Sequence, residues 1–262
     1  MERDITFGQY HSVSSVIHDR DPRAKLFLTF AYLIGLFLTG SYVYLGGMTL
    51  FLVVYALLAR LPLSMMVNTL KPVRWLILVS ILLNLFYGAG DVILSLGIIN
   101  IKETGVRAAA LVGIRMILMI MFASTLTFTT MPNQLMDGME KSFSWLRVFK
   151  VPVTELALTM SIALRFIPIL KGEMDRIMNA QRARGMDFEA GGMIKRLRSF
   201  IPVIIPMFVS ATKKAESLAL AMDSRCYTGG AKRTKLHPLR YKKGDLLLYI
   251  LGIAILVLGI IL

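Results

Sequence analysis

The apolar stretch VPVTELALTMSIALRFIPIL, residues 151–170, decides how the chain is folded, because its length and hydrophobicity suit a membrane span. Glu155 and Arg165 lie inside it, Pro168 lies near its end, and the charged run KGEMDR follows at once. A charge at the middle of a bilayer is costly. A span here would also place the basic residues 171–244 outside the cell. We therefore interpret the stretch as a helix buried mostly against protein, or lying at the membrane surface.

Five other apolar runs surround this stretch. The chain has 262 residues, of which 56% are hydrophobic, whereas soluble domains are typically about 45–50% apolar. Each run approaches the roughly 20 residues that a helix needs to cross a bilayer. They cover residues 26–40, 43–59, 75–90, 106–128 and 245–262. The sequence therefore predicts an all-α, polytopic membrane bundle of about five transmembrane helices.

The charges predict how these helices are oriented. Residues 131–244 hold 20 Lys and Arg against nine Asp and Glu, whereas the turn at 41–47 holds no charge. Lys and Arg are enriched in cytoplasmic loops, so we expect the N-terminus and residues 131–244 inside the cell and the C-terminus outside. The net charge of +14 is then mainly a topology signal, and we expect no nucleic-acid partner.

This topology divides the chain into three parts. Residues 1–130 form an N-terminal membrane bundle with four transmembrane helices, residues 131–244 form a cytoplasmic region of long amphipathic helices, and residues 245–262 form the last transmembrane helix. Between the third and fourth spans, the strand-forming pattern VILSLGIINIK predicts a short hairpin at the outer face. Arg115 lies within the fourth run, where it either reaches toward an interface or pairs with an acid.

Two long helices are predicted in the cytoplasmic region. Apolar residues recur at helical spacing over 152–184 and again over 200–230, and each segment starts with proline and ends with arginine near glycine. Gly185 occupies the position of a glycine that ends a helix. Small residues on both segments would let the helices cross closely: Ala157, Ser161 and Ala163 on the first, and Ala211, Ala215 and Ala219 on the second.

Arg184 and Arg225, at the ends of these helices, have two interpretations. Each could merely complement the partial negative charge of a helix C-terminus, which stabilises by about 0.3–1 kcal/mol. Alternatively, the rigid donor fork of each guanidinium could pair with a carboxylate in the groove of a partner. The presence of two similar ends favours the second interpretation, because a partner with two subunits would require two.

Catalytic and cofactor motifs are absent from the sequence. Its one cysteine, Cys226, excludes an internal disulfide, and no Cys or His cluster has metal-ligand spacing. No phosphate-binding pattern G-x-x-x-x-G-K is present, and no nucleophile lies beside a base. We expect no cofactor, no metal and no enzymatic activity in this chain.

The two helix ends resemble those of the transmembrane T component of energy-coupling factor transporters, the EcfT family. That family ends two cytoplasmic coupling helices with an Ala-Arg-Gly signature. The first is intact here as Ala183, Arg184 and Gly185, whereas the second reads Ser224, Arg225 and Cys226 and keeps only the arginine. The resemblance extends from the first span to the last.

The resemblance implies a non-catalytic scaffold in a bacterial plasma membrane. In the family, two ABC-type ATPases (EcfA and EcfA′) dock on the coupling helices, and a small substrate-binding S component lies on their apolar surface. ATP hydrolysis in these partners drives uptake of vitamins or other micronutrients. By this resemblance Arg184 and Arg225 would insert into the ATPases, and their four flanking residues would shape the ends. The apolar surface for the S component is read as Met160, Ile167, Met207 and Phe208, for which core packing is an equal explanation.

Two other functions are compatible with a membrane chain of this kind. A conventional ABC permease is one, although such a permease usually docks a single short helix on each ATPase. The other is a membrane enzyme at the cytoplasmic interface that uses Asp187, Glu189 or Asp223 as acid–base groups. These carboxylates lack paired spacing, which disfavours the enzyme.

Overall fold

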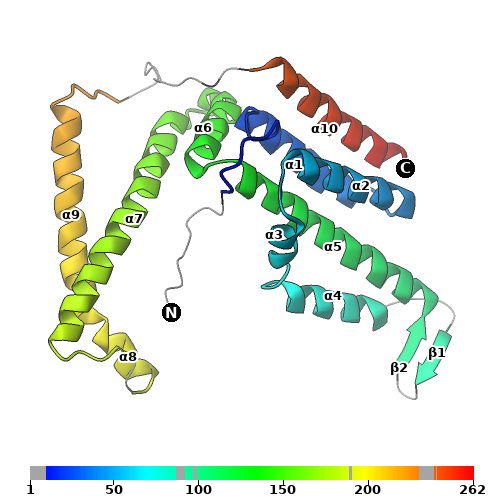
Figure 1. Ribbon diagram of the computed structural model, residues 1–262, viewed down its shortest axis with the longest axis horizontal. Coiled ribbons are helices and arrows are strands. Elements are labelled where there is room, and N and C mark those ends of the chain that lie inside the picture. The colour runs from blue at the N-terminus through cyan, green and yellow to red at the C-terminus, as the bar shows by residue number, and fades with distance from the viewer. Residues whose placement is uncertain (1–9, 87–91, 97–98, 189–190, 230–238, 240) are drawn as a thin grey trace. The chain divides into compact units, whose positions relative to one another are not determined.

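A computed structural model describes residues 10–86, 92–96, 99–188, 191–229, 239 and 241–262. The chain forms two compact units, residues 1–142 with 239–262 (unit 1) and residues 143–238 (unit 2). Figure 1 shows their elements, which are helical apart from one two-stranded hairpin in the described part of the chain. As the sequence predicts, the chain is an all-α membrane protein. By contacts the chain divides after residues 142 and 238, because the helix that follows residue 131 packs against the bundle. The division at residues 131 and 245 by location in the membrane stays a prediction.

Unit 1 contains every apolar run that the sequence predicts to be transmembrane. Its elements are α1 (Pro22–Leu38), α2 (Tyr42–Leu58), α3 (Leu63–Asn68), α4 (Arg74–Phe86), β1 (Val92–Leu96), β2 (Ile99–Lys102), α5 (Glu103–Thr129), α6 (Pro132–Ser142) and α10 (Lys243–Ile261). The antiparallel pair of β1 and β2 confirms the predicted hairpin. The short helix α3 was not expected, and α6 begins at Pro132, a residue that suits the first turn of a helix.

Three helices of the described chain are long and apolar enough to cross a membrane: α5, α10 and α7 (Val153–Ala183) in unit 2. The helices α2 and α4 are apolar but shorter. With 13 residues, α4 is about 20 Å long, less than the roughly 30 Å of a bilayer core. Part of its predicted run, residues 87–90, lies outside the described residues.

The helix α5 is antiparallel to α1. At one end the buried Lys25 donates from Nζ to the carbonyl oxygen of Thr129, over 2.9 Å. At the C-terminal end of α1, Arg115 of α5 donates from Nη2 to the carbonyl oxygen of Thr39, over 2.6 Å. The start of α1 therefore lies beside the end of α5. Arg115 therefore caps the C-terminus of α1, a structural role that the sequence does not reveal.

The helix α10 is parallel to α1. Near the start of both, the backbone N–H of Asp21 donates to the buried carboxylate of Asp245, over 3.1 Å. Further along, a Cβ added at Gly35 would lie 2.9 Å from the side chain of Ile255. The absence of a side chain at Gly35 is what allows the two helices to approach this closely.

The directions of α5 and α10 limit how many times the chain between these two helices can cross the membrane. The end of α5 and the start of α10 both lie beside the start of α1, so the chain leaves α5 and enters α10 on the same side of unit 1. The chain between α5 and α10 must therefore cross the membrane an even number of times, or not at all. The helix α7 meets the length and composition of a span, but it cannot be a sole sixth span in this arrangement.

Unit 1 is held together by aromatic packing and exposes apolar side chains outward. The ring of Tyr32 stacks on that of Phe122 with centroids 3.8 Å apart, and its hydroxyl donates to the carbonyl oxygen of Met48. On α10, Leu247 and Ile250 are 60% and 58% exposed. A large apolar outer surface indicates contact with lipid in a protein of this composition.

Unit 2 contains both of the long helices predicted for the cytoplasmic region. Its elements are the 3-10 helix η1 (Ser144–Phe149), α7, α8 (Met193–Ser199) and α9 (Ile201–Asp223). The helix α7 continues through Pro168 to Ala183. Residues 132–149 form two helices, α6 and η1, which belong to different units.

Candidate functional site

The end of α7, residues 183–185, is called the first tip. Gly185 has a φ of +84°, which is left-handed. The backbone N–H of Met186 donates back to the carbonyl oxygen of Gln181 over 3.0 Å. This hydrogen bond and the left-handed residue before it define a Schellman motif, which confirms Gly185 as the end of the helix. Arg184, the residue before the turn, is held on the last turn of α7.

The end of α9, residues 224–226, is called the second tip, and it has the same backbone. Cys226 has a φ of +57°, and the N–H of Tyr227 donates to the carbonyl oxygen of Met222 over 3.0 Å. Cys226 therefore corresponds to Gly185, and Arg225 to Arg184. The second signature keeps the geometry of the first although two of its three residues differ.

All six predicted docking residues are exposed: Ala183, Arg184, Gly185, Ser224, Arg225 and Cys226. Within the described part of the chain, neither Arg184 nor Arg225 takes part in an ion pair. Both guanidinium groups are thus available to a partner.

The two tips lie at opposite ends of an antiparallel helix pair. Midway along it, the ammonium of Lys214 on α9 lies 3.6 Å from the carboxylate of Glu173 on α7. Beyond the first tip, the ring of Phe188 packs on that of Phe200 at the start of α9, with centroids 5.4 Å apart. The 23 residues of α9 extend about 35 Å, which separates the tips by roughly the same distance.

Small residues lie between the two helices, as the sequence predicts. A hollow of about 340 Å³ between α7 and α9 is lined by Ala163, Ala211, Ala215 and Ala219, together with larger apolar side chains. Small side chains at a helix contact let the backbones approach. Of the six small residues predicted there, Ala157 and Ser161 do not line this hollow.

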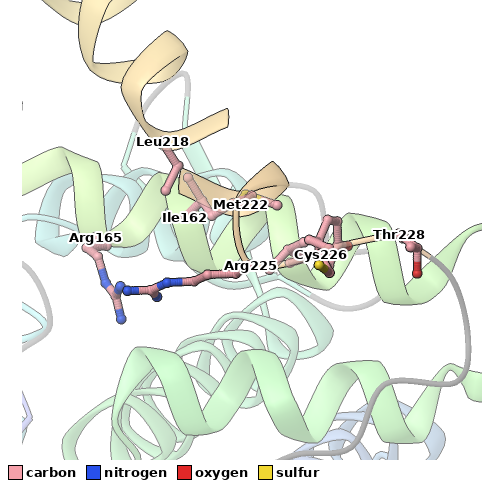
Figure 2. Close-up of a pocket in the computed structure, with 10 residues that line it drawn as sticks. Ile162, Arg165, Leu218, Met222, Arg225, Cys226 and Thr228 are labelled. Carbon is pink, nitrogen blue, oxygen red and sulfur yellow. The ribbon is translucent and has the colours of Figure 1, made fainter. Parts of the chain in front are cut away.

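A second hollow, of about 520 Å³, contains the guanidinium of the second tip. It is lined by Leu158, Ile162, Arg165, Leu218, Met222, Arg225, Cys226, Tyr227, Thr228 and Gly229. Figure 2 shows Arg165, from α7, and Arg225, from beyond the end of α9, pointing toward one another. Both side chains are exposed. No acidic residue lines this hollow.

Sequence reasoning missed Arg165 as a site residue. In the sequence, its charge indicates only that residues 151–170 do not span the membrane. The signal that places it beside Arg225 is the antiparallel register of α7 and α9, because the ion pair of Glu173 and Lys214 sets which turns face each other.

The four residues predicted to contact a membrane partner do not form one described cluster. Met160 and Phe208 are 55% and 67% exposed, whereas Ile167 and Met207 are half-buried. None of them lines either of the two hollows. Their assignment stays a prediction.

The acid–base groups of the rival enzyme are not brought together. Asp187 follows the first tip and Asp223 is the last residue of α9, so they lie at opposite ends of the pair. Glu189 lies outside the described residues. Among the described residues, no group of three or more His, Cys, Asp or Glu could hold a metal ion.

Substitution of Cys226 tests the left-handed turn of the second tip. Cys226→Gly is expected to stabilise the turn by about 1 kcal/mol, because glycine has no Cβ penalty at positive φ. Cys226→Val is expected to weaken it, since a β-branched residue disfavours this conformation. Hydrogen exchange at the N–H of Tyr227 measures the effect, slower in the glycine variant and faster in the valine variant. Equal exchange in both would contradict a left-handed Cys226.

Comparison with known proteins identifies relatives over almost the whole chain. A family model described as CbiQ, cobalt transport protein, matches residues 13–236. An energy-coupling factor transporter transmembrane protein EcfT from Ruminiclostridium cellulolyticum is 43% identical over 247 residues, which cover 94% of this chain and 92% of the relative. The protein of the same name from Acidaminococcus fermentans is 40% identical over 261 residues, covering 98% and 96%. That from Streptococcus thermophilus is 40% identical over 259 residues, covering 98% and 97%.

Proposed function

This chain belongs to the CbiQ/EcfT family and is a multi-pass transmembrane component of an energy-coupling factor transporter in a bacterial membrane, and from that premise we propose that it couples two ATPases to a substrate-binding membrane subunit. The observation that carries the proposal is the pair of equivalent, exposed, arginine-bearing helix ends at opposite ends of α7 and α9.

Each tip docks one ATPase. A guanidinium on a turn flanked by small residues can enter a groove, where its planar donors pair with a carboxylate. A separation of about 35 Å along the helix pair suits two neighbouring subunits, whereas a single binding pocket could not reach both ends. The shared backbone of the tips supports equivalent roles for Arg184 and Arg225.

The paired helices transmit motion between the subunits. The helix α7 is one continuous 31-residue helix, and the contact with α9 through small side chains keeps the two close. When the ATPases move, a force applied at both tips displaces the pair as a body. The substrate-binding subunit then responds through the apolar surfaces of α7 and α9, where Met160 and Phe208 are exposed.

Unit 2 lies on the cytoplasmic side, and α7 does not cross the bilayer. Two observations support this location: the chain leaves α5 and enters α10 on the same side of unit 1, and basic residues are in excess over 131–244. ATP is bound and hydrolysed in the partner ATPases, and the transported vitamin or other micronutrient is held by the substrate-binding subunit.

Purification of the tagged chain from its own cells tests this proposal. We expect two ATPase subunits and a small membrane protein to co-purify with it in stable amounts. Recovery of the chain without any ATPase, under conditions that preserve membrane complexes, would contradict the proposed function.

A further inference from the structure

We propose that Arg165 is a second docking residue, which joins Arg225 to hold one carboxylate of the ATPase that binds the second tip. The inference rests on the proposed function and adds a residue that lies outside both three-residue tips. It starts from the hollow of about 520 Å³ that both side chains line and from their mutual orientation in Figure 2.

The charges of this hollow are unbalanced. Two guanidinium groups point toward one another, and none of the ten lining residues is acidic. Glu173, the acid that links the two helices, is already paired with Arg176 and Lys214. Cations brought together repel each other, and an anion placed between them relieves the repulsion.

A carboxylate fits this pair of cations. Its two oxygens offer about four lone-pair sites, enough to accept hydrogen bonds from both guanidinium forks at once. The apolar lining, which includes Leu158 and Leu218, lowers the local dielectric once a partner covers the hollow, and this strengthens a charge-assisted hydrogen bond. An acidic side chain on the ATPase surface is therefore the expected occupant.

The first tip lacks this arrangement. Its neighbouring cation, Arg182, lies over the ring of Phe188, 5.8 Å from the centroid. At the first tip the Ala-Arg-Gly signature is intact, and Arg184 is the one guanidinium proposed to dock. At the second tip the residues on either side of Arg225 differ from the signature, and Arg165 lies beside Arg225. The two ATPase contacts therefore differ in the number of guanidinium groups that they engage.

The test measures binding of the purified ATPase pair to the whole chain in lipid nanodiscs. Arg165→Gln is expected to weaken binding about tenfold and to reduce its salt dependence, since one charged contact is lost. Arg165→Lys should restore only part of the affinity, because lysine keeps the charge but not the planar fork. Arg176→Gln is the matched control, an exposed arginine of the same helix outside the hollow.

A double-mutant cycle separates the shared carboxylate from independent contacts. If Arg165 and Arg225 hold one carboxylate, Arg165→Gln has a much smaller effect in the Arg225→Gln background than in the wild type. Equal binding by wild type and Arg165→Gln, or full additivity in the cycle, would overturn the inference while leaving the proposed function intact. An effect seen only with nucleotide present would assign the anion as a phosphate and also overturn it. Absence of wild-type binding would instead reject the proposed function itself.

Discussion

Reversal of the charge at both tips, by Arg184→Glu together with Arg225→Glu, is expected to abolish ATPase binding and transport. Truncating one partner of a buried charge pair at an interface costs about 2–5 kcal/mol. Two such losses weaken binding by at least roughly a thousandfold, and the introduced carboxylates add repulsion against the acids of the partner. Both tips are exposed turns, so the variant should still insert into the membrane. Co-purification and substrate uptake in cells measure the effect.

The matched control changes the same charge on the same two helices. Arg176 and Lys213 are exposed on α7 and α9, away from both tips. Arg176→Glu with Lys213→Glu should therefore leave ATPase binding and uptake nearly unchanged. Normal transport by the tip variant, or equal loss in the control, would show that the tips do not carry the interaction.

The second tip is expected to face the cytoplasm, and the native Cys226 can report this directly. It is the chain's one cysteine, and it is exposed. In cells that produce the chain without its ATPases, a membrane-impermeant maleimide should leave Cys226 unmodified while the cells are intact and modify it after the membrane is permeabilised. The expected change is nearly all-or-none, because the bilayer excludes the reagent from the inner face.

Gly40→Cys in a Cys226→Ser background is the control, because it places the single thiol on the outer side of the membrane. Gly40 is exposed in the turn between α1 and α2, and a Cβ added there meets no atom within 4 Å. This thiol should be modified in intact cells. Modification of the native Cys226 in intact cells would mean that the topology is inverted or that the chain crosses the membrane once between the end of α5 and the second tip.

Much of the fold could be predicted from local sequence. Hydrophobic runs of sufficient length specify helices, and Gly185 specifies a helix end because glycine adopts a left-handed φ without a Cβ penalty. The hairpin followed from β-forming residues between two spans. These signals depend on neighbouring residues alone.

The remaining features depend on how helices pack, which periodicity does not specify. The assignment of α6 to unit 1 depends on Gly138, where an added Cβ would lie 3.0 Å from that of Pro22. The capping of α1 by Arg115 depends on the antiparallel direction of α5. The position of Arg165 beside Arg225 likewise depends on the register between α7 and α9, so the docking tips were predicted but their cationic neighbour was not.

The equivalence of Cys226 and Gly185 shows how a diverged motif can keep its geometry. By sequence alone, the second tip is expected to be wider than the first, because Cys226 carries a side chain where the first tip has Gly185. The backbone, however, adopts the same left-handed turn at both positions. The thiol at this turn is exposed, and it lies within the surface that an ATPase would cover.

The rate at which a maleimide modifies Cys226, measured on the purified chain with and without its ATPase pair, tests the docking of the tips most directly. If the second tip enters a groove of an ATPase, modification should slow at least roughly tenfold in the complex, because access to the thiol controls its reactivity. The Gly40→Cys, Cys226→Ser variant should react equally fast in both states. An unchanged rate at Cys226 in a complex that is otherwise intact would contradict the account.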